Sequence, residues 1–126
     1  MTPFGEKLRA LRLVKGVDQA TMAADLGVSA AYLSALEHGK KGSPSWAMTQ
    51  KIIQYFGLIW DGAEALQLLA QLSKPRVTIE TAGLDPRATR AANLLARKVG
   101  HLSPADLDAL LSVLEGQSDD PEAADQ

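Results

Sequence analysis

Cysteine is absent from the 126-residue chain, which excludes a disulfide framework and a thiolate metal site. Only two histidines occur, and neither has other ligand-type side chains at metal-binding spacing, so no metal site is predicted. The sequence also lacks a nucleophile elbow and a glycine-rich loop of the kind that binds nucleotide phosphates. We therefore expect a protein that is not an enzyme and that needs no cofactor.

Long apolar runs are missing as well. No stretch approaches the roughly 20 apolar residues that span a bilayer. The first residues, MTPFGEKLRALR, contain no apolar segment typical of a secretory signal. Apolar residues nevertheless make up 46% of the chain, which is enough to form a core. The sequence predicts a soluble cytoplasmic protein without a membrane partner.

The formal net charge of −2 hides an uneven distribution. Residues 1–58 contain seven basic against four acidic residues, whereas residues 59–126 contain six against eleven. Residues 117–126 are acidic and have no large apolar side chain, so we expect this tail to be disordered. The basic half suits a nucleic-acid partner, although an excess of three charges is also typical of an ordinary solvated surface.

Apolar residues at helical spacing predict an all-α fold in which residues 1–73 form five helices. Asp18 and Ser29 are the expected N-caps of the second and third helices, and Ser43 or Ser45 caps the fourth. Trp46 is expected on the apolar side of the fourth helix. The five helices are predicted at 4–15, 19–26, 30–38, after SPS up to Gly57, and 60–73.

The segment after residue 73 is predicted to be an accessory unit. Lys74-Pro75 marks a boundary because proline ends the preceding helix. The only β-like run is RVTIETAG at 76–83, and one strand is not stable alone. This run either pairs with the same strand of a second subunit or is a plain extended linker. Two helices, 84–100 and 103–116, follow the short strand, so the expected units are 1–73, 74–116 and the tail.

A second subunit would pack against apolar side chains of the accessory unit. These come from the β-like run and from the leucine stripe of the last helix. The candidate dimer-interface residues are Val77, Ile79, Leu107, Leu110, Leu111 and Leu114.

Residues 19–39, QATMAADLGVSAAYLSALEHG, contain two short helices joined by a tight glycine turn. Ala23 must be small where these helices cross, and Gly27 permits positive φ in the turn. Val28, Leu33 and Leu36 would seat the second of the two helices on the core. This arrangement is a helix-turn-helix motif.

The pattern QxxxAxxxGVSxxxLSxLExG follows a basic amphipathic helix and precedes a PS-initiated helix that ends in FGL. Over about residues 4–70 it resembles the phage-repressor-like family of helix-turn-helix regulators, of the Xre and Cro/C1 type. The resemblance implies a repressor that binds double-stranded DNA as a homodimer. The alternative is an antitoxin-type interaction protein, which inhibits a partner protein and regulates its own operon.

The resemblance also places the candidate DNA contacts. Relatives often carry Gln, Arg or Asn at the base-contacting positions, but alanines dominate here, which leaves Tyr32 and Ser34 as the hydrogen-bonding candidates. The candidate base contacts are Ala30, Ala31, Tyr32, Ser34 and Ala35. The candidate phosphate contacts are Gln19, Ser29, Lys40, Lys41, Ser43 and Ser45.

Several neighbouring side chains have a structural alternative. Glu37 is expected to pair with Arg9 or Arg12 of the first helix, although Arg9, Arg12 and Lys15 could instead extend the phosphate contact. His38 precedes Gly39 and is at least as well explained by capping as by DNA contact. The two tryptophans, Trp46 and Trp60, are expected in the core or at an interface.

Overall fold

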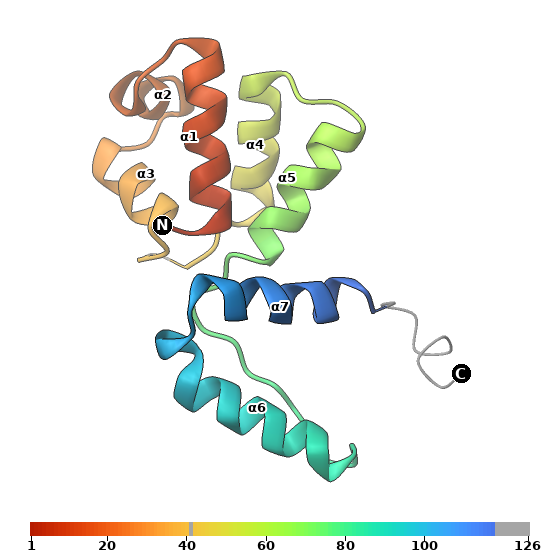
Figure 1. Cartoon of the computed structure of the whole chain (residues 1–126). Helices are drawn as coiled ribbons and strands as arrows, with labels where there is room; N and C mark the ends of the chain where they lie inside the picture. Colours follow the sequence, from red (N-terminus) through yellow and green to blue (C-terminus); the bar gives the residue numbers. More distant parts are fainter. Residues whose placement is uncertain (41, 118–126) are drawn as a thin grey trace. The chain divides into compact units, whose positions relative to one another are not determined.

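A computed structural model describes residues 1–40 and 42–117, and its regular structure is helical (Figure 1). The chain divides into two compact units, Met1–Thr78 and Ile79–Gln126. The helices of the first unit are α1 (Pro3–Lys15), α2 (Gln19–Leu26), α3 (Ala30–Glu37), α4 (Trp46–Phe56) and α5 (Asp61–Gln71). The helices of the second unit are α6 (Pro86–Lys98), the 3-10 helix η1 (Val99–His101) and α7 (Pro104–Glu115).

The predicted strand at 76–83 is wrong, because no strand forms within residues 1–40 and 42–117. Val77 and Ile79 lie in an extended, exposed segment that has no neighbouring strand to complete a ladder. The segment ends in a turn, where the Leu84 N–H donates to the Thr81 carbonyl over 3.1 Å. The fold class is therefore all-α without the strand, and the extended-linker alternative describes this run.

Side-chain caps explain where the helices begin. Asp18 accepts a hydrogen bond from the Thr21 N–H, and Ser29 accepts one from the Tyr32 N–H, which confirms both predicted caps. Ser45, and not Ser43, caps α4. Ser103 and Asp106 form a complete capping box at the start of α7. Each of these caps satisfies backbone N–H groups that a helix start leaves unpaired.

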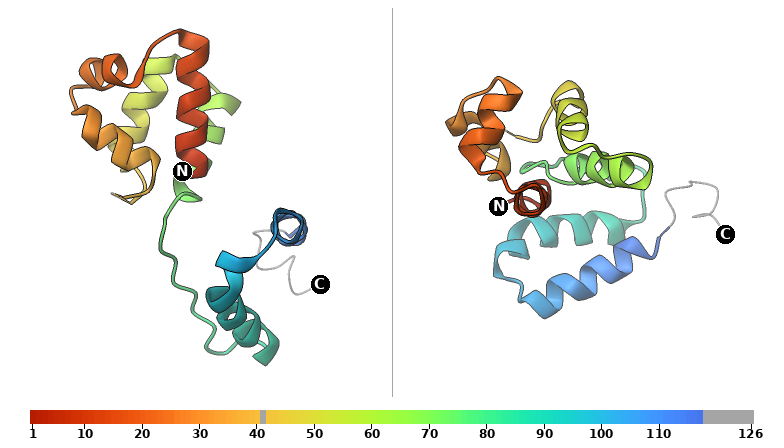
Figure 2. Two further views of the ribbon diagram at one scale, coloured as in Figure 1. Left: turned by 60° about the vertical axis from the view of Figure 1, so that its left-hand side comes forward. Right: turned by 90° about the horizontal axis from the view of Figure 1, so that it is seen from above.

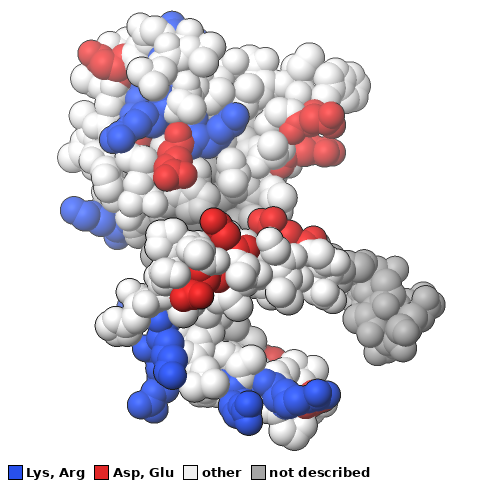
Figure 3. Space-filling model, in the orientation of Figure 1, with Lys and Arg blue, Asp and Glu red and all other residues white. Residues whose placement is uncertain are grey.

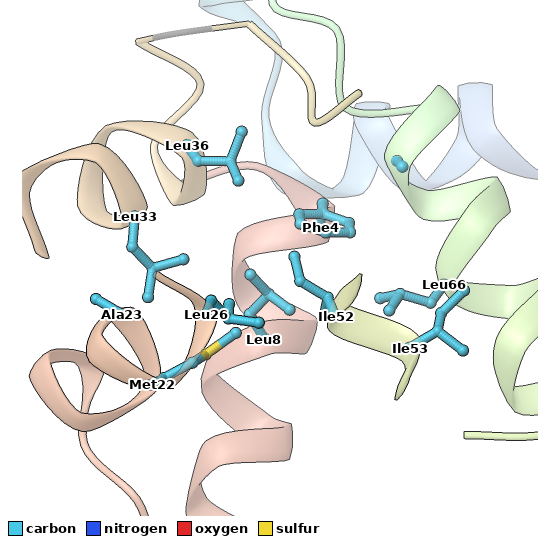
Figure 4. Packing of buried hydrophobic residues seen from close by; sticks show 11 residues of the cluster. Phe4, Leu8, Met22, Ala23, Leu26, Leu33, Leu36, Ile52, Ile53 and Leu66 are labelled. Carbon is cyan, nitrogen blue, oxygen red and sulfur yellow. The ribbon is translucent and has the colours of Figure 1, made fainter. Parts of the chain in front are cut away.

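The core of the first unit lies between all five of its helices (Figure 4). Phe4 and Leu8 of α1 meet side chains of α2 and α3 on one side and Ile52 of α4 and Leu66 of α5 on the other. Trp46 is not part of this core: its side chain stands at the very start of α4, is 76% exposed, and precedes the buried turn of the helix. Trp60, in the α4–α5 connection, is 83% exposed and likewise lies outside the core.

The second unit has no comparable core. The chain turns at η1, between α6 and α7 (Figure 2). None of the residues described in α6, η1 or α7 is buried. No helix in the described part of the chain combines the length and apolar character that crossing a membrane requires.

Candidate nucleic-acid interface

The turn between α2 and α3 holds the two helices in helix-turn-helix geometry. Gly27 adopts φ 76°, a left-handed conformation that is available to glycine at little steric cost. The Val28 N–H donates to the Ala23 carbonyl over 3.0 Å, which closes the turn. Ala23 is 2% exposed at the α2–α3 contact, as its predicted role requires. The sequence therefore determines both the turn and the close crossing.

One side of α3 packs against the core, and the N-terminal part of its other side is exposed. Leu33 and Leu36 are buried in the core, whereas Ala30 and Ala31 are exposed at the N-terminal end of the helix. Tyr32 is half-buried, and part of its side chain packs against the core. Ser34 and Ala35 are also half-buried. The five predicted base-contacting residues thus share the first two turns of α3, with the two alanines the most accessible of them.

Glu37 connects three helices at the end of α3. Its side chain is 1% exposed, and Oε1 accepts a hydrogen bond from the Arg12 guanidinium of α1. Its other oxygen, Oε2, accepts a hydrogen bond from Nε2 of Gln19 over 2.7 Å. The predicted partner of Glu37 is therefore Arg12, and Arg12 is not a phosphate contact because it is buried and paired. A buried charge needs such partners on each of its oxygens.

Gln19, predicted as a phosphate contact, is oriented by this same network. One of its two amide N–H groups is donated to Glu37, and the amide carries a second N–H. The bond to Glu37 joins residues 18 positions apart. No pattern in the sequence pairs a glutamine at the start of one helix with a glutamate at the end of the next, so sequence reasoning missed the bond.

α1 approaches α3 so closely that only glycine fits. A Cβ on Gly5 would lie 2.1 Å from the carbonyl oxygen of Glu37, well inside van der Waals contact. The Thr2 N–H and hydroxyl both donate to that carbonyl, at 3.0 and 3.1 Å. The C-terminal end of α3 is therefore fixed by α1 through backbone contacts as well as through the Arg12–Glu37 pair.

The C-terminal end of α2, next to the turn, is attached to α4. Nζ of Lys51 donates to the Leu26 carbonyl over 3.0 Å, and the Tyr55 hydroxyl donates to Asp25 over 2.8 Å. Desolvation, together with the hydrogen bond to Asp25, raises the pKa of Tyr55 above its ordinary value. Hydrogen bonds from Thr21 lower the pKa of the capping Asp18. The Lys51 and Tyr55 contacts therefore hold the C-terminal end of α2 against α4.

The predicted phosphate contacts flank α3. Lys40 is exposed after the helix, Ser43 is half-buried, and Lys41 lies outside the described residues. The Ser29 and Ser45 hydroxyl oxygens accept backbone N–H groups as helix caps, which leaves each hydroxyl hydrogen available.

The side chains with a structural alternative differ in their contacts. Nζ of Lys15 donates to the Tyr55 carbonyl over 2.9 Å and stands over the Tyr55 ring, whereas Arg9 is exposed. Nδ1 of His38 lies 2.9 Å from the Ser34 carbonyl, which favours its capping role.

The predicted dimer-interface residues are all accessible. Val77 and Ile79 are 74% and 58% exposed, and the leucines of the α7 stripe are between 38% and 62% exposed. No group of three or more histidine, aspartate or glutamate side chains that could hold a metal occurs in the part of the chain that the structure describes.

Comparison with known proteins identifies the family. Residues 3–68, just over half of the chain, match the family described as a helix-turn-helix domain, and the protein belongs to that family. A relative from Bacillus subtilis (strain 168), the HTH-type transcriptional repressor RghR, is 39% identical over 62 residues, which cover 49% of this chain and 46% of that protein. The uncharacterized HTH-type transcriptional regulator RghRB of the same organism is 38% identical over 52 residues, or 41% of this chain and 37% of that protein.

The chain therefore spans less than half the length of each of these relatives. No solved structure matches it significantly. The matched residues coincide with α1 to α5, while α6 and α7 lie outside the family match.

Proposed function

We propose that the protein is a transcriptional regulator of the phage-repressor-like type that binds double-stranded DNA with α3 in the major groove. The observation that carries this proposal is the presentation of α3: Leu33 and Leu36 anchor it, while Ala30 and Ala31 project from its N-terminal end. In helix-turn-helix proteins the N-terminal residues of the second helix contact base edges. The names of the two relatives, a repressor and a regulator, support the same function.

Direct base recognition by this helix is limited. Alanine methyl groups contact thymine methyl groups but offer no hydrogen bonds, so the Tyr32 and Ser34 hydroxyls supply the polar contacts. Phosphate contacts from Lys40, Lys41, Ser43 and Ser45, with Gln19 and Ser29 at the helix starts, fix the position of the domain on the duplex. Sequence-dependent deformation of the DNA and the spacing of two half-sites then contribute a large share of the specificity.

The proposed function also bears on location. Since the protein acts on DNA, the cytoplasmic location expected from the sequence follows from this proposal.

The same proposal makes the regulator a homodimer held together by its second unit. Residues 79–117 contain no buried residue, no cysteine and no metal-binding cluster. A unit of about 40 residues or fewer usually needs a disulfide, a metal or oligomerisation to be stable. A second copy of the chain would cover the exposed leucines Leu107, Leu110, Leu111 and Leu114 of α7 and give the unit a core.

Charge complementarity favours a second copy over another occupant. α6 carries four basic residues and no acidic one, whereas α7 carries three acidic residues and no basic one. Figure 3 shows the basic side chains along α6 and the acidic ones along α7. In a two-fold arrangement each α6 can lie beside the partner's α7, so that opposite charges flank a shared apolar core.

A binding measurement tests the proposed function. DNase I footprinting on the promoter of the protein's own gene should show protection over two half-sites about one helical turn apart, centre to centre. Affinity should fall steeply with salt concentration as counterions are released. Absence of protection on any promoter fragment, or binding that does not respond to salt, would contradict the proposal.

The antitoxin-type alternative predicts a different outcome. In that case the apolar side of α7 binds a different protein, and the purified chain alone remains monomeric. A small protein that co-purifies with the chain and forms a stoichiometric complex through the second unit would favour it. A homodimer that binds the promoter without such a partner favours the regulator.

A further inference from the structure

Residues 74–76, which leave α5, return to the loop that follows α3. Ser73 anchors this return: its hydroxyl oxygen accepts the Phe4 N–H over 2.9 Å and the residue is 3% exposed. Pro75 then packs near Gly39, where an added Cβ would lie 3.7 Å from the Cβ of Pro75. The start of α1 thus fixes the end of α5 beside the loop after the helix-turn-helix motif.

This return brings cations of two distant segments to one shallow hollow. Lys40 and Ser43 line it from the loop after α3, and Lys74 and Arg76 line it from the chain that leaves α5. All three cations are exposed, and no acidic residue lines the hollow. Neither of the two ion pairs found among the described residues involves any of them. The hollow is therefore an unneutralised basic surface directly beside α3.

We propose that Lys74 and Arg76 bind the sugar-phosphate backbone of the DNA next to the half-site that α3 contacts. The inference rests on the proposed function and adds a second segment to its phosphate-binding surface. An open hollow with exposed cations suits an extended polyanion, because a single free phosphate is normally held by converging, buried donors. Arginine and lysine contacts of this kind position a protein on the duplex and carry no sequence information.

Salt dependence gives a quantitative expectation. Log affinity falls as log salt concentration rises, and each phosphate contact that is lost makes this negative slope shallower by about 0.9. A homodimer would lose two contacts per substitution. Replacement of Lys74 or Arg76 by alanine should therefore reduce the magnitude of the slope by about 2. It should weaken binding to the promoter duplex and to the random duplex by the same factor.

The experiment is a fluorescence anisotropy titration of full-length protein against a promoter duplex and a random duplex of equal length, over a series of salt concentrations. Lys74→Ala, Arg76→Ala and the matched control Lys7→Ala are compared with the unsubstituted protein. Lys7 is exposed on α1 and does not line the hollow, so its removal tests the effect of net charge alone. Circular dichroism melting confirms that each variant is folded.

For Lys74→Ala and Arg76→Ala we expect a salt-dependence slope of smaller magnitude and an equal loss of affinity for both duplexes. Lys7→Ala should match the unsubstituted protein. If the unsubstituted protein binds DNA and the two variants keep its slope, the inference is overturned while the proposed function stands. An equal loss in Lys7→Ala would also overturn it, because the effect would then be one of net charge. If the unsubstituted protein binds neither duplex, the proposed function itself fails.

Discussion

The side-chain nitrogen of Gln19 donates a hydrogen bond to the buried carboxylate of Glu37 over 2.7 Å, which ties the first residue of α2 to the last residue of α3. Arg12 of α1 occupies the other carboxylate oxygen. The orientation of the motif therefore depends on a buried polar network as well as on the apolar side of α3. Networks of this kind are stabilising only when every member is satisfied.

We expect removal of one member to be costly. Glu37→Gln leaves the Arg12 charge buried without its counter-ion, and breaking a buried pair in this way destabilises by about 3–5 kcal/mol. Urea denaturation of Glu37→Gln, Arg12→Met and the double variant measures the coupling between the two residues. The double variant should be less destabilised than the sum of the single ones. Additivity within about 0.5 kcal/mol would show that the two side chains act independently.

Gly5→Ala should be destabilising because the new methyl group would meet the Glu37 carbonyl, whose backbone has little room to move. Overpacking of this kind costs about 1–3 kcal/mol, and occasionally more. Gly62→Ala is the matched control, since it also lies near the start of a helix but its Cβ would make only ordinary contacts at 3.8 Å. Thermal unfolding should therefore shift down for Gly5→Ala alone. Equal melting temperatures in the two variants would contradict the close approach of α1 and α3.

Leu111→Glu should convert the homodimer to monomers. The leucine stripe of α7 is exposed in the isolated chain, and a charge at its centre would be buried in the shared core without a partner. Ser112→Glu places the same charge on the opposite side of α7 and should leave the dimer intact. Sedimentation velocity across a concentration series measures both variants. A monomeric unsubstituted chain, or a Leu111→Glu variant that still dimerises, would refute the proposed interface.

Tyr32 and Lys40 should affect DNA binding in different ways. Tyr32→Phe removes a hydroxyl proposed to contact bases and keeps the ring that packs against the core. It should therefore reduce the preference for the promoter duplex over the random duplex by about 1 kcal/mol, the net contribution of one hydrogen bond. Lys40→Ala removes a proposed phosphate contact and should weaken both duplexes about equally. Competition titrations with the two duplexes give the ratio. A ratio that falls only in Lys40→Ala would reverse the two assigned roles.

The sequence predicts the first unit well because its helices follow from local rules. Capping by Asp18 and Ser29 and the turn at Gly27 depend on neighbours within a few residues, and the inward side of α3, with Leu33 and Leu36, follows from helical spacing. The structure confirms them. The Gln19–Glu37 bond and the return of Lys74 and Arg76 to the loop after α3 depend on tertiary packing. Sequence spacing alone therefore could not predict them.

The errors have a similar cause. Val77 and Ile79 alternate with polar residues as in a strand, but a strand exists only with a partner, and the described chain provides none. Trp46 has helical spacing from the buried Thr49 and Ile53, yet it is the first residue of α4, before the helix reaches the core. The residue contacts proposed for DNA and for a second subunit remain predictions.

The most direct test of the central claim is the affinity of Ala31→Glu for the promoter duplex. Ala31 is exposed near the start of α3 and makes no core contact, so glutamate should fold normally there. If α3 enters the major groove, the new carboxylate meets the phosphate-lined groove and costs about 3 kcal/mol of binding free energy, on the order of a hundredfold in affinity. We expect that loss of affinity with an unchanged melting temperature. Unchanged affinity in the folded variant would show that α3 does not contact DNA.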